Sequence, residues 1–272
     1  MRLLKTVLDF YINSSIHVAL SSSSLVIMSQ FMFHLPIDFD VVGFTFFGTI
    51  VGYNFLKYDA LARIKKIEMK NELKGIVFLS FLSFLACGYF FFNLQFKTKM
   101  YAVLVLFLTL LYTLSFFPNK KNARNWVGVK IYIVSLCWVG VTLALPIVDA
   151  GIPITTDFYL KCIQRFILVF VLILIFEIID LASDDPHLQT VPQKIGVKRT
   201  KILGLLLLLP FYFLEYLKMN FDSNQLIVNF ILLIILLLFI IFANQNRSKY
   251  YTSFWVESVP VLWLGLLLIS QL

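Results

Sequence analysis

Charged residues are scarce in this chain of 272 residues: 14% are Asp, Glu, Lys or Arg, whereas 60% are hydrophobic. The mean hydropathy is +0.88. Soluble domains carry about 25% charged residues, so the composition excludes a water-soluble fold and predicts a membrane protein. Cysteine and histidine are also rare, with three of each, and they form no CxxC motif or His–Cys cluster. No disulfide framework or zinc site is therefore readable.

Long hydrophobic runs dominate the sequence instead. A run of about 18 or more apolar residues is long enough to cross the hydrocarbon core as an α-helix. The runs lack the two-residue alternation of barrel strands, which favours helices over a β-barrel. We expect an all-α, polytopic membrane protein, with residues 1–272 forming one domain. The nine predicted transmembrane helices cover approximately residues 12–33, 39–56, 75–95, 100–117, 126–148, 158–179, 202–217, 224–243 and 251–270.

Basic residues are distributed unequally between the two sides of these helices. Of the 23 Lys and Arg residues, 17 lie in the N-terminal segment and in loops on the same side, four lie on the opposite side, and two lie within helices. Because Lys and Arg accumulate in cytoplasmic loops, this predicts a cytoplasmic N-terminus and, with nine spans, a C-terminus on the opposite side. The basic side would also attract anionic lipid headgroups. Its charges are dispersed over short loops, so nucleic acid is not an expected partner.

Sequence motifs of soluble enzyme classes are absent. The chain has no GxxxxGK[ST] for nucleotide hydrolysis, no GxGxxG for dinucleotide binding and no recognisable Ser/His/Asp or Cys/His arrangement. The motif that does stand out is acidic and lies at the end of the sixth predicted helix.

Acidic residues cluster in the stretch FEIIDLASDD, residues 176–185. If the sixth helix continues to Asp184, then Glu177, Asp180 and Asp184 stand at i, i+3 and i+7, within roughly 60° of one another on one face. Carboxylates in one stripe repel each other and are costly at a membrane boundary, so they call for a cation. Oxygen ligands with open positions suit Mg²⁺ that also holds a phosphate. The alternative is a solvated helix end whose acids pair with nearby basic residues.

This stretch resembles the second acidic motif of the UbiA superfamily of intramembrane prenyltransferases, D-x-x-D-x-x-x-D followed by G-x-x-T-L-(P/A)-x-x-L-G. Glu177, Asp180 and Asp184 match the acidic part, with Glu in place of the first Asp, and TVPQKIG at residues 190–196 matches the following element. The intervening stretch is one residue shorter than in the family and has no glycine. The predicted helix count and the cytoplasmic N-terminus also resemble that family. The resemblance implies that the three acids are catalytic and bind Mg²⁺.

The first motif of that family, N-(D/Q)-x-x-D-x-x-x-D, corresponds to the end of the second predicted helix. Asn54 matches, but Tyr58 and Ala62 stand at the two aspartate positions, and Asp59 is displaced by one residue. The first metal site therefore looks eroded, and a single Mg²⁺ site is expected. Lys57 is expected to share the charge of the diphosphate with the remaining residues of the site.

The resemblance also implies that the connection between the fourth and fifth helices contacts the diphosphate. It supplies an aromatic residue and basic residues there in UbiA-like enzymes. The positive-inside rule is the competing explanation for such basic residues. The full set of predicted substrate-binding residues is Asn54, Lys57, Asp59, Tyr112, Lys121, Arg124, Lys130, Lys194 and Lys198.

The function that this resemblance implies is transfer of a prenyl group from an isoprenoid diphosphate to an aromatic or otherwise lipophilic acceptor, with Mg²⁺ as cofactor. The alternative is a non-catalytic or lipid-binding membrane protein that kept the helix bundle and lost its first metal site. A transporter is a third possibility, but no helix has the paired mid-membrane Gly/Pro breaks of a midplane site. An assay for prenyl transfer separates the first two, and uptake into proteoliposomes tests the third.

Overall fold

The computed structural model describes residues 2–64, 71–113, 129–184, 189–219 and 221–270. Helices joined by short turns make up these ranges, and no strand occurs within them, so the all-α prediction is confirmed. The helices are α1 (Arg2–Asn13), α2 (Ile16–Met32), α3 (Phe39–Ile64), α4 (Asn71–Asn93), α5 (Phe96–Thr113), α6 (Val129–Val139), η3 (Gly140–Ala144), α7 (Leu145–Ala150), α8 (Thr156–Asp180), α9 (Val191–Phe213), η5 (Leu214–Leu217), α10 (Ser223–Phe242), η6 (Tyr251–Val256) and α11 (Val259–Ile269).

Seven helices in the described part of the chain are long and apolar enough to cross a membrane, and the count is eight if the bent pair α1–α2 is one span. The structure therefore confirms a multi-pass membrane architecture, while the number nine stays a prediction. α5 coincides with most of the predicted span 100–117, whose last residues lie outside the described ranges. Three predicted spans are composite. α6, η3 and α7 form one span, α9 continues into the 3₁₀ turn η5, and the π-helix η6 precedes α11.

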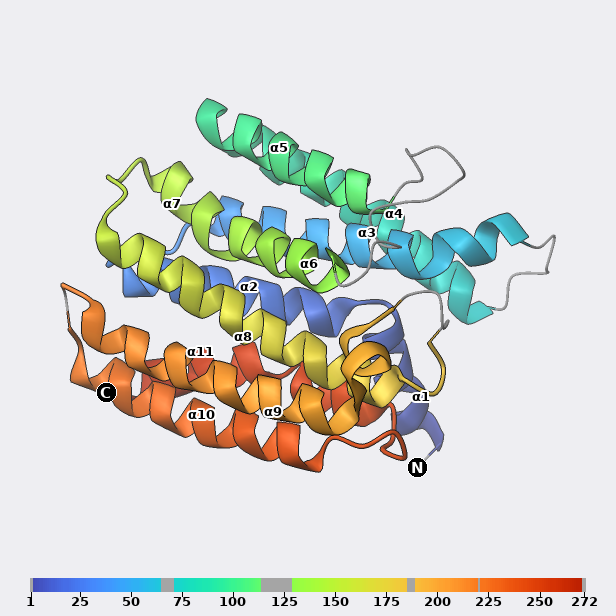
Figure 1. Ribbon diagram of the computed structural model, residues 1–272. Coiled ribbons are helices and arrows are strands. Elements are labelled where there is room, and N and C mark those ends of the chain that lie inside the picture. The colour runs from blue at the N-terminus through green and yellow to red at the C-terminus, as the bar shows by residue number, and fades with distance from the viewer. Residues whose placement is uncertain (1, 65–70, 114–128, 185–188, 220, 271–272) are drawn as a thin grey trace.

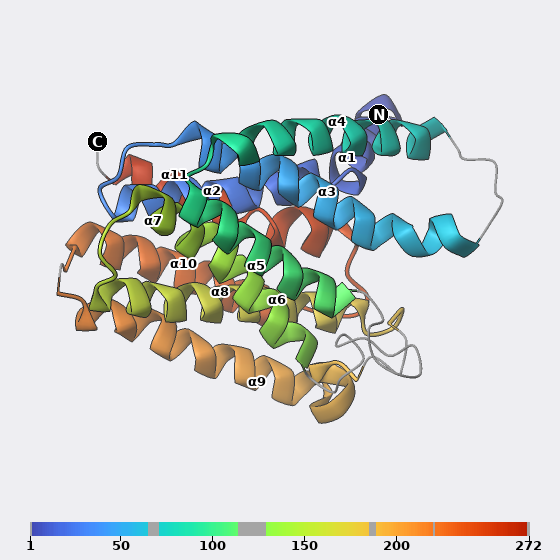
Figure 2. The ribbon, with the colours of Figure 1, turned by 90° about the horizontal axis from the view of Figure 1, so that it is seen from above.

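The helices lie alongside one another in one bundle, with the two termini at opposite ends (Figures 1 and 2). We call the end at which α1 begins, α8 ends and α9 begins the N-terminal end of the bundle. The predicted cytoplasmic side is this end, although the orientation in the membrane remains a prediction. α8 is central and packs against α6 and α9, whereas α2 packs against α3 and α11.

The main hydrophobic core surrounds α8. Its sequence from Phe166 to Ile179 is apolar without interruption except for Glu177, and 72% of this span is buried inside the bundle, the largest share among the candidate spans of the described chain. Leu168, Val171 and Ile175 are accordingly buried among residues of α2, α9, α10 and α11. A rigid central helix of this kind fixes the position of whatever stands at its two ends.

The break between α1 and α2 is a second fixed point. The two helices meet at an angle of 56°, and Ser15 between them has a left-handed backbone with φ 63°. Two side chains of α3, those of Asn54 and Tyr58, hydrogen-bond to this break. Asn54 accepts from Ser15 Oγ at 2.8 Å and donates to the Ser14 carbonyl at 3.0 Å, and the Tyr58 hydroxyl donates to the Asn13 carbonyl at 2.9 Å.

Candidate functional site

The acidic stretch lies where α8 reaches the N-terminal end of the bundle. Glu177 is buried, with 3% of its surface exposed, whereas Asp180 is exposed and Asp184 is half-buried. α8 ends at Asp180 and does not continue to Asp184, so the condition for the predicted carboxylate stripe is not met. The hydroxyl of Ser183 donates to the Asp180 carbonyl at 2.9 Å, a local bond that competes with helical continuation.

The turn after α8 nevertheless keeps the two aspartates together. The backbone N–H groups of Ser183 and Asp184 both donate to the Asp180 carbonyl at 2.8 Å. Asp184 is close enough to interact electrostatically with Asp180 and with Glu177. The three acids therefore gather at the helix end by way of a hydrogen-bonded turn.

Glu177 has a specific partner at the start of α9. Its Oε2 accepts a hydrogen bond from the Val191 backbone N–H at 3.0 Å. The first N–H groups of a helix have no partner within the helix and carry a partial positive charge, so a carboxylate stabilises them. The Gln193 side chain also reaches back to accept from the Thr190 backbone N–H at 2.9 Å, which is one half of a capping box.

The short spacing between the acids and TVPQKIG has a structural role in this chain. Residues 191–195 form a short helical turn that ends at Gly196, whose φ of 79° and ψ of 155° interrupt α9. Glycine is suited to this position because φ is positive there. The turn presents its N-terminus to Glu177, and Lys194 in the same turn is exposed.

Of the predicted basic residues in the described part of the chain, Lys130 is the one whose charge acts on the acids. It stands in the first turn of α6, is half-buried, and interacts electrostatically with both Glu177 and Asp180. Lys194 and Lys198 are exposed on the two sides of the Gly196 break. Lys121 and Arg124 lie outside the described residues. Tyr112 belongs to α5, but its side chain also lies outside the described part.

The residues of the first motif make structural contacts in α3. Besides its bonds to the α1–α2 break, Asn54 donates to Ser80 Oγ at 2.8 Å, so both N–H groups of its amide and its oxygen are engaged. Lys57 donates to Ser15 Oγ at 3.1 Å and to the Ile12 carbonyl at 3.4 Å. The side chain of Asp59 lies outside the described part of the chain. The predicted roles of these residues in substrate binding stay predictions.

Two acidic residues within the spans were missed by sequence reasoning. Glu215 is fully buried in a network with lysines at the opposite end of the bundle, and Glu257 is half-buried directly after η6, where its backbone carbonyl accepts from Ser21. The available signal was the rarity of ionisable residues inside transmembrane helices, which marks each one for attention. Neither residue belongs to a motif, and their partners are distant in the sequence.

Within the described ranges, no group of three or more His, Cys, Asp or Glu side chains is arranged to hold a metal ion. One carboxylate oxygen of Glu177 already accepts the hydrogen bond from the Val191 backbone N–H. Asp180 and Asp184 remain as a close pair of acids. Mg²⁺ in proteins is commonly bound by one or two carboxylates together with substrate phosphates and water, so this pair fits a Mg²⁺ that arrives with a diphosphate.

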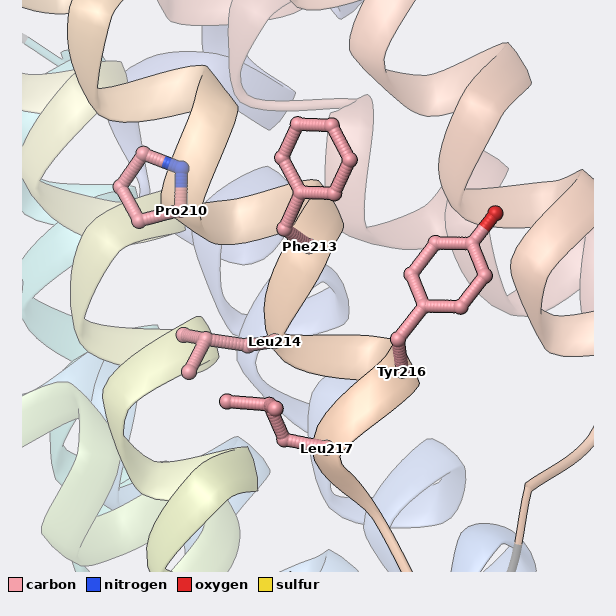
Figure 3. Close-up of a pocket in the computed structure, with 5 residues that line it drawn as sticks. All are labelled: Pro210, Phe213, Leu214, Tyr216 and Leu217. Carbon is pink, nitrogen blue, oxygen red and sulfur yellow. The ribbon is translucent and has the colours of Figure 1, made fainter.

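A pocket of about 500 Å³ lies elsewhere, at the far end of α9 (Figure 3). α9 has 23 residues, so the pocket lies roughly 30 Å from Glu177 along the helix. No charged side chain lines it, and the Tyr216 hydroxyl is the one polar side-chain group among its lining residues. The residues that line it are Pro210, Phe213, Leu214, Tyr216 and Leu217.

Comparisons with known proteins identify the fold. No protein-family model matches this sequence, and no curated protein matches it. A solved structure of digeranylgeranylglyceryl phosphate synthase is similar with a TM-score of 0.56 and 17% identity, over 99% of this chain and 97% of that one. A UbiA homolog from Archaeoglobus fulgidus bound to Cd²⁺ is similar with a TM-score of 0.53 and 11% identity, over 99% and 97% of the two chains. The predicted resemblance is confirmed at the level of the fold: this chain has a UbiA-type fold.

Proposed function

We propose that this protein is a UbiA-type prenyltransferase, which moves a prenyl group from an isoprenoid diphosphate to a lipophilic or aromatic acceptor. The observation that carries the proposal is the cluster of Glu177, Asp180 and Asp184 at the C-terminal end of α8, with Lys130 in the first turn of α6, within a UbiA-type fold. In such a reaction the C–O bond to the diphosphate breaks, the diphosphate leaves with the electron pair, and the acceptor bonds to the prenyl carbon.

The acids at the end of α8 are the proposed ligands of the metal ion. Asp180 and Asp184 would hold Mg²⁺, which when bound neutralises charge on the departing diphosphate. The Archaeoglobus homolog was solved with Cd²⁺ bound, which supports a divalent-cation site in this fold. Glu177 orients the start of α9 through Val191 and has its second oxygen left for a ligand role.

The basic residues supply the other charges. Lys130 lies beside Glu177 and Asp180, and Lys194 and Lys198 project from the exposed start of α9. A diphosphate that approaches the aspartates would meet these cations from the α6 and α9 sides. Positively charged groups placed around a leaving group stabilise the charge that develops on it. Lys121 and Arg124 are proposed to contribute from the α5–α6 connection.

A non-catalytic protein is the second candidate, and a specific observation favours it. Asn54, the residue of the first motif that matches the family, has its amide fully engaged with Ser14, Ser15 and Ser80. Tyr58, at one of the aspartate positions, is engaged with the Asn13 carbonyl. These contacts are expected of a protein whose first-motif residues hold the α1–α2 break instead of a metal ion. They are compatible with a second motif that binds Mg²⁺ and with one that does not.

Binding of prenyl diphosphates with and without Mg²⁺ tests the proposal. Geranyl, farnesyl and geranylgeranyl diphosphate serve as probes for the purified protein in lipid nanodiscs. We expect Asp180→Asn and Asp184→Asn each to weaken Mg²⁺-dependent binding about tenfold, which is about 1.4 kcal/mol. Asp157→Asn is the matched control, because Asp157 stands in the first turn of the same helix at its opposite end.

The outcomes separate the two candidates. Mg²⁺-dependent binding that the two aspartate variants weaken, followed by release of diphosphate when lipid acceptors are added, supports the transferase. The same binding without turnover on any acceptor favours the non-catalytic protein. Absence of Mg²⁺-dependent binding for all three probes in the folded wild type would refute both the metal site and the transferase.

A further inference from the structure

The first helix, α1, has one apolar and one polar side. At about 100° per residue, Leu3, Leu4, Val7 and Leu8 fall within an arc of about 140°. The opposite side of the helix carries its polar residues, which are Lys5, Thr6, Asp9 and Asn13. A helix of this pattern is suited to a boundary between an apolar and a polar medium.

The apolar side of α1 is left uncovered by the described residues. Leu3, Leu4 and Val7 are 80%, 77% and 60% exposed, and we call these three side chains the apolar face of α1. Neighbouring apolar side chains on one side of a helix form a patch, and such patches mark contacts with another molecule or with a membrane. The structure also contains two observations that identify what covers this face.

Hydrogen bonds from the polar side fix the level of α1 in the membrane. Asn13 donates to Glu72 at 2.9 Å, and Glu72 is the first residue of the span Glu72–Asn93. Asp9 accepts from Lys249 at 2.8 Å and from the Tyr250 hydroxyl at 2.7 Å, and the span Tyr251–Ile269 begins at the next residue. α1 therefore lies at the level where two spans begin.

The direction of α1 differs from that of the bundle. It meets α2 at 56° and crosses the N-terminal end of the bundle (Figures 1 and 2). Its 12 residues extend about 18 Å, whereas the hydrocarbon core is about 30 Å thick. A helix this short, at this level and in this direction, lies along the membrane surface.

The surface next to α1 faces lipid. The Phe10 ring, on the same side of α1 as Leu3, packs against Gly75 of α4. Phe78 and Phe81, one and two turns further along this apolar span, are 64% and 58% exposed. The apolar face of α1 thus adjoins side chains that the acyl chains of the bilayer surround.

We propose that α1 is an interfacial helix, with its apolar face in the acyl region of the adjacent leaflet and Lys5 at the headgroups of anionic phospholipids. Lys5 is exposed and lies about 60° around the helix from Leu8, at the edge of the apolar side. Its long side chain can reach the headgroup phosphates from there. The predicted excess of basic residues on this side of the membrane favours anionic lipid as the partner.

Spin labels on the two sides of α1 test its orientation. The three native cysteines are replaced by alanine, and one new cysteine is introduced by Leu4→Cys, Val7→Cys or Thr6→Cys. Thr6 is exposed and lies about 200° around the helix from Leu4, so it is the matched control. In lipid nanodiscs, oxygen concentrates in the acyl region and a nickel chelate stays in water. We expect the ratio of oxygen to nickel accessibility to be severalfold higher at residues 4 and 7 than at residue 6.

Hydrogen exchange tests the contact with headgroups. Amide exchange of α1 is measured in nanodiscs of phosphatidylcholine with and without phosphatidylglycerol. We expect exchange to be about fivefold slower with phosphatidylglycerol, because a lysine near an anionic surface is attracted to it. Lys5→Gln should remove most of this difference. Lys97→Gln, which changes an exposed lysine in the first turn of α5, should retain it.

Three results would overturn the proposal. Equal accessibility ratios at residues 4 and 6 would place the apolar face in water. Exclusion of both reagents from residue 4, together with spin–spin broadening between copies, would show that a second copy covers this face instead of lipid. Exchange that does not respond to phosphatidylglycerol, or a response that Lys5→Gln leaves unchanged, would refute the headgroup contact. Melting temperatures show that each variant is folded. The acids at the end of α8 take no part in these measurements, so these results would leave the proposed transferase untouched.

Discussion

The two ends of α8 carry opposite kinds of polar site. At its beginning, Lys161 and Gln164 donate to Glu215 Oε2 at 3.3 and 3.0 Å, Asn229 donates to the same oxygen at 2.9 Å, and Lys218 donates to Oε1. All of these side chains are buried. At the other end, the described contacts of the three acids include one hydrogen bond from Val191, and Asp180 is exposed.

This difference teaches where to look for function in an apolar bundle. Charges taken out of water are tolerated when hydrogen bonds satisfy them, as at Glu215, whose two carboxylate oxygens both accept from buried donors. Acids that remain close together, open to solvent and only partly bonded retain their capacity for a cation. The polar residues at the N-terminal end of α8 therefore hold neighbouring helices together, whereas the acids at its C-terminal end form the candidate site.

The largest expected effect comes from disrupting the buried network around Glu215 at the N-terminal end of α8. Glu215→Gln removes the charge that compensates Lys161 and Lys218 and leaves both ammonium groups buried without an anion. We expect a loss of about 3–5 kcal/mol in the free energy of unfolding, measured by denaturant titration in detergent.

A triple variant sharpens this prediction. Replacing Lys161, Glu215 and Lys218 together by Met, Leu and Met removes all the buried charge at once, and we expect it to be more stable than Glu215→Gln alone. A triple variant that is less stable than the single one would show that the network stabilises the bundle by itself. Asp157→Asn, at the same end but half-buried, serves as the control.

Arg165 is the next test, because it is a buried charge without an acid. Its guanidinium donates to Thr142 Oγ1 at 2.9 Å, to Ser29 Oγ at 3.2 Å and to the Leu25 carbonyl at 3.3 Å, and it lies 5.6 Å from the ring centre of Trp263. Thr142 belongs to the π-helix η3.

Arg165→Met should therefore cost about 2–3 kcal/mol in the free energy of unfolding, since several acceptors lose a charged donor. Hydrogen exchange at η3 should rise more than exchange at the end of α8. Faster exchange throughout α8 would instead indicate that Arg165 holds the whole helix in place.

The sequence predicts the fold well because hydrophobic length is a local property. The runs at 158–179 and 224–243 became α8 and α10 with ends shifted by a few residues. The break at Ser15 was not predicted, because it depends on bonds from Asn54 and Tyr58, about forty residues away. The π-helices were not visible either, since their carbonyl groups are satisfied by distant side chains such as Arg165.

The candidate site also has features that the sequence predicts and features that it does not. The acids of the second motif could be found because they are close together in sequence and interrupt an apolar run. The engagement of Glu177 with Val191 could not, because it requires the chain to turn back after Asp184. The hydrogen bond from Ser21 to the Glu257 carbonyl could not be predicted either, since 236 positions separate the two residues and no motif connects them.

Glu177 gives a smaller effect and separates structure from ligand binding. Glu177→Gln keeps an acceptor for the Val191 N–H but loses its charge at the start of α9. We expect a loss of about 1 kcal/mol in the free energy of unfolding. Asp180→Asn, at an exposed residue without such a contact, should leave stability unchanged. If Asp180→Asn destabilises the protein as much as Glu177→Gln does, the aspartate is structural and the contrast between the two ends of α8 is weakened.

The smallest effect is expected at the exposed ion pair between Lys249 and Asp9. Comparing it with the network at Glu215 shows how strongly burial affects the contribution of an ion pair to stability. Lys249 donates to Asp9 at 2.8 Å, and this hydrogen bond raises the pKa of Lys249. A raised pKa contributes stability below the usual lysine value of about 10.4, and that stability is lost as the pH rises through the folded-state value. The Lys249 side chain is 61% exposed, so water and salt screen the pair. We expect Asp9→Asn to change the melting temperature barely at neutral pH and less still at high salt, because the asparagine oxygen can still accept from the Tyr250 hydroxyl, which bonds Asp9 at 2.7 Å. The destabilisation by Glu215→Gln should persist at high salt, because ions do not reach a buried pair. Equal salt sensitivity of the two variants would mean that the network at Glu215 is open to solvent, and the distinction between a closed and an open end of α8 would fail.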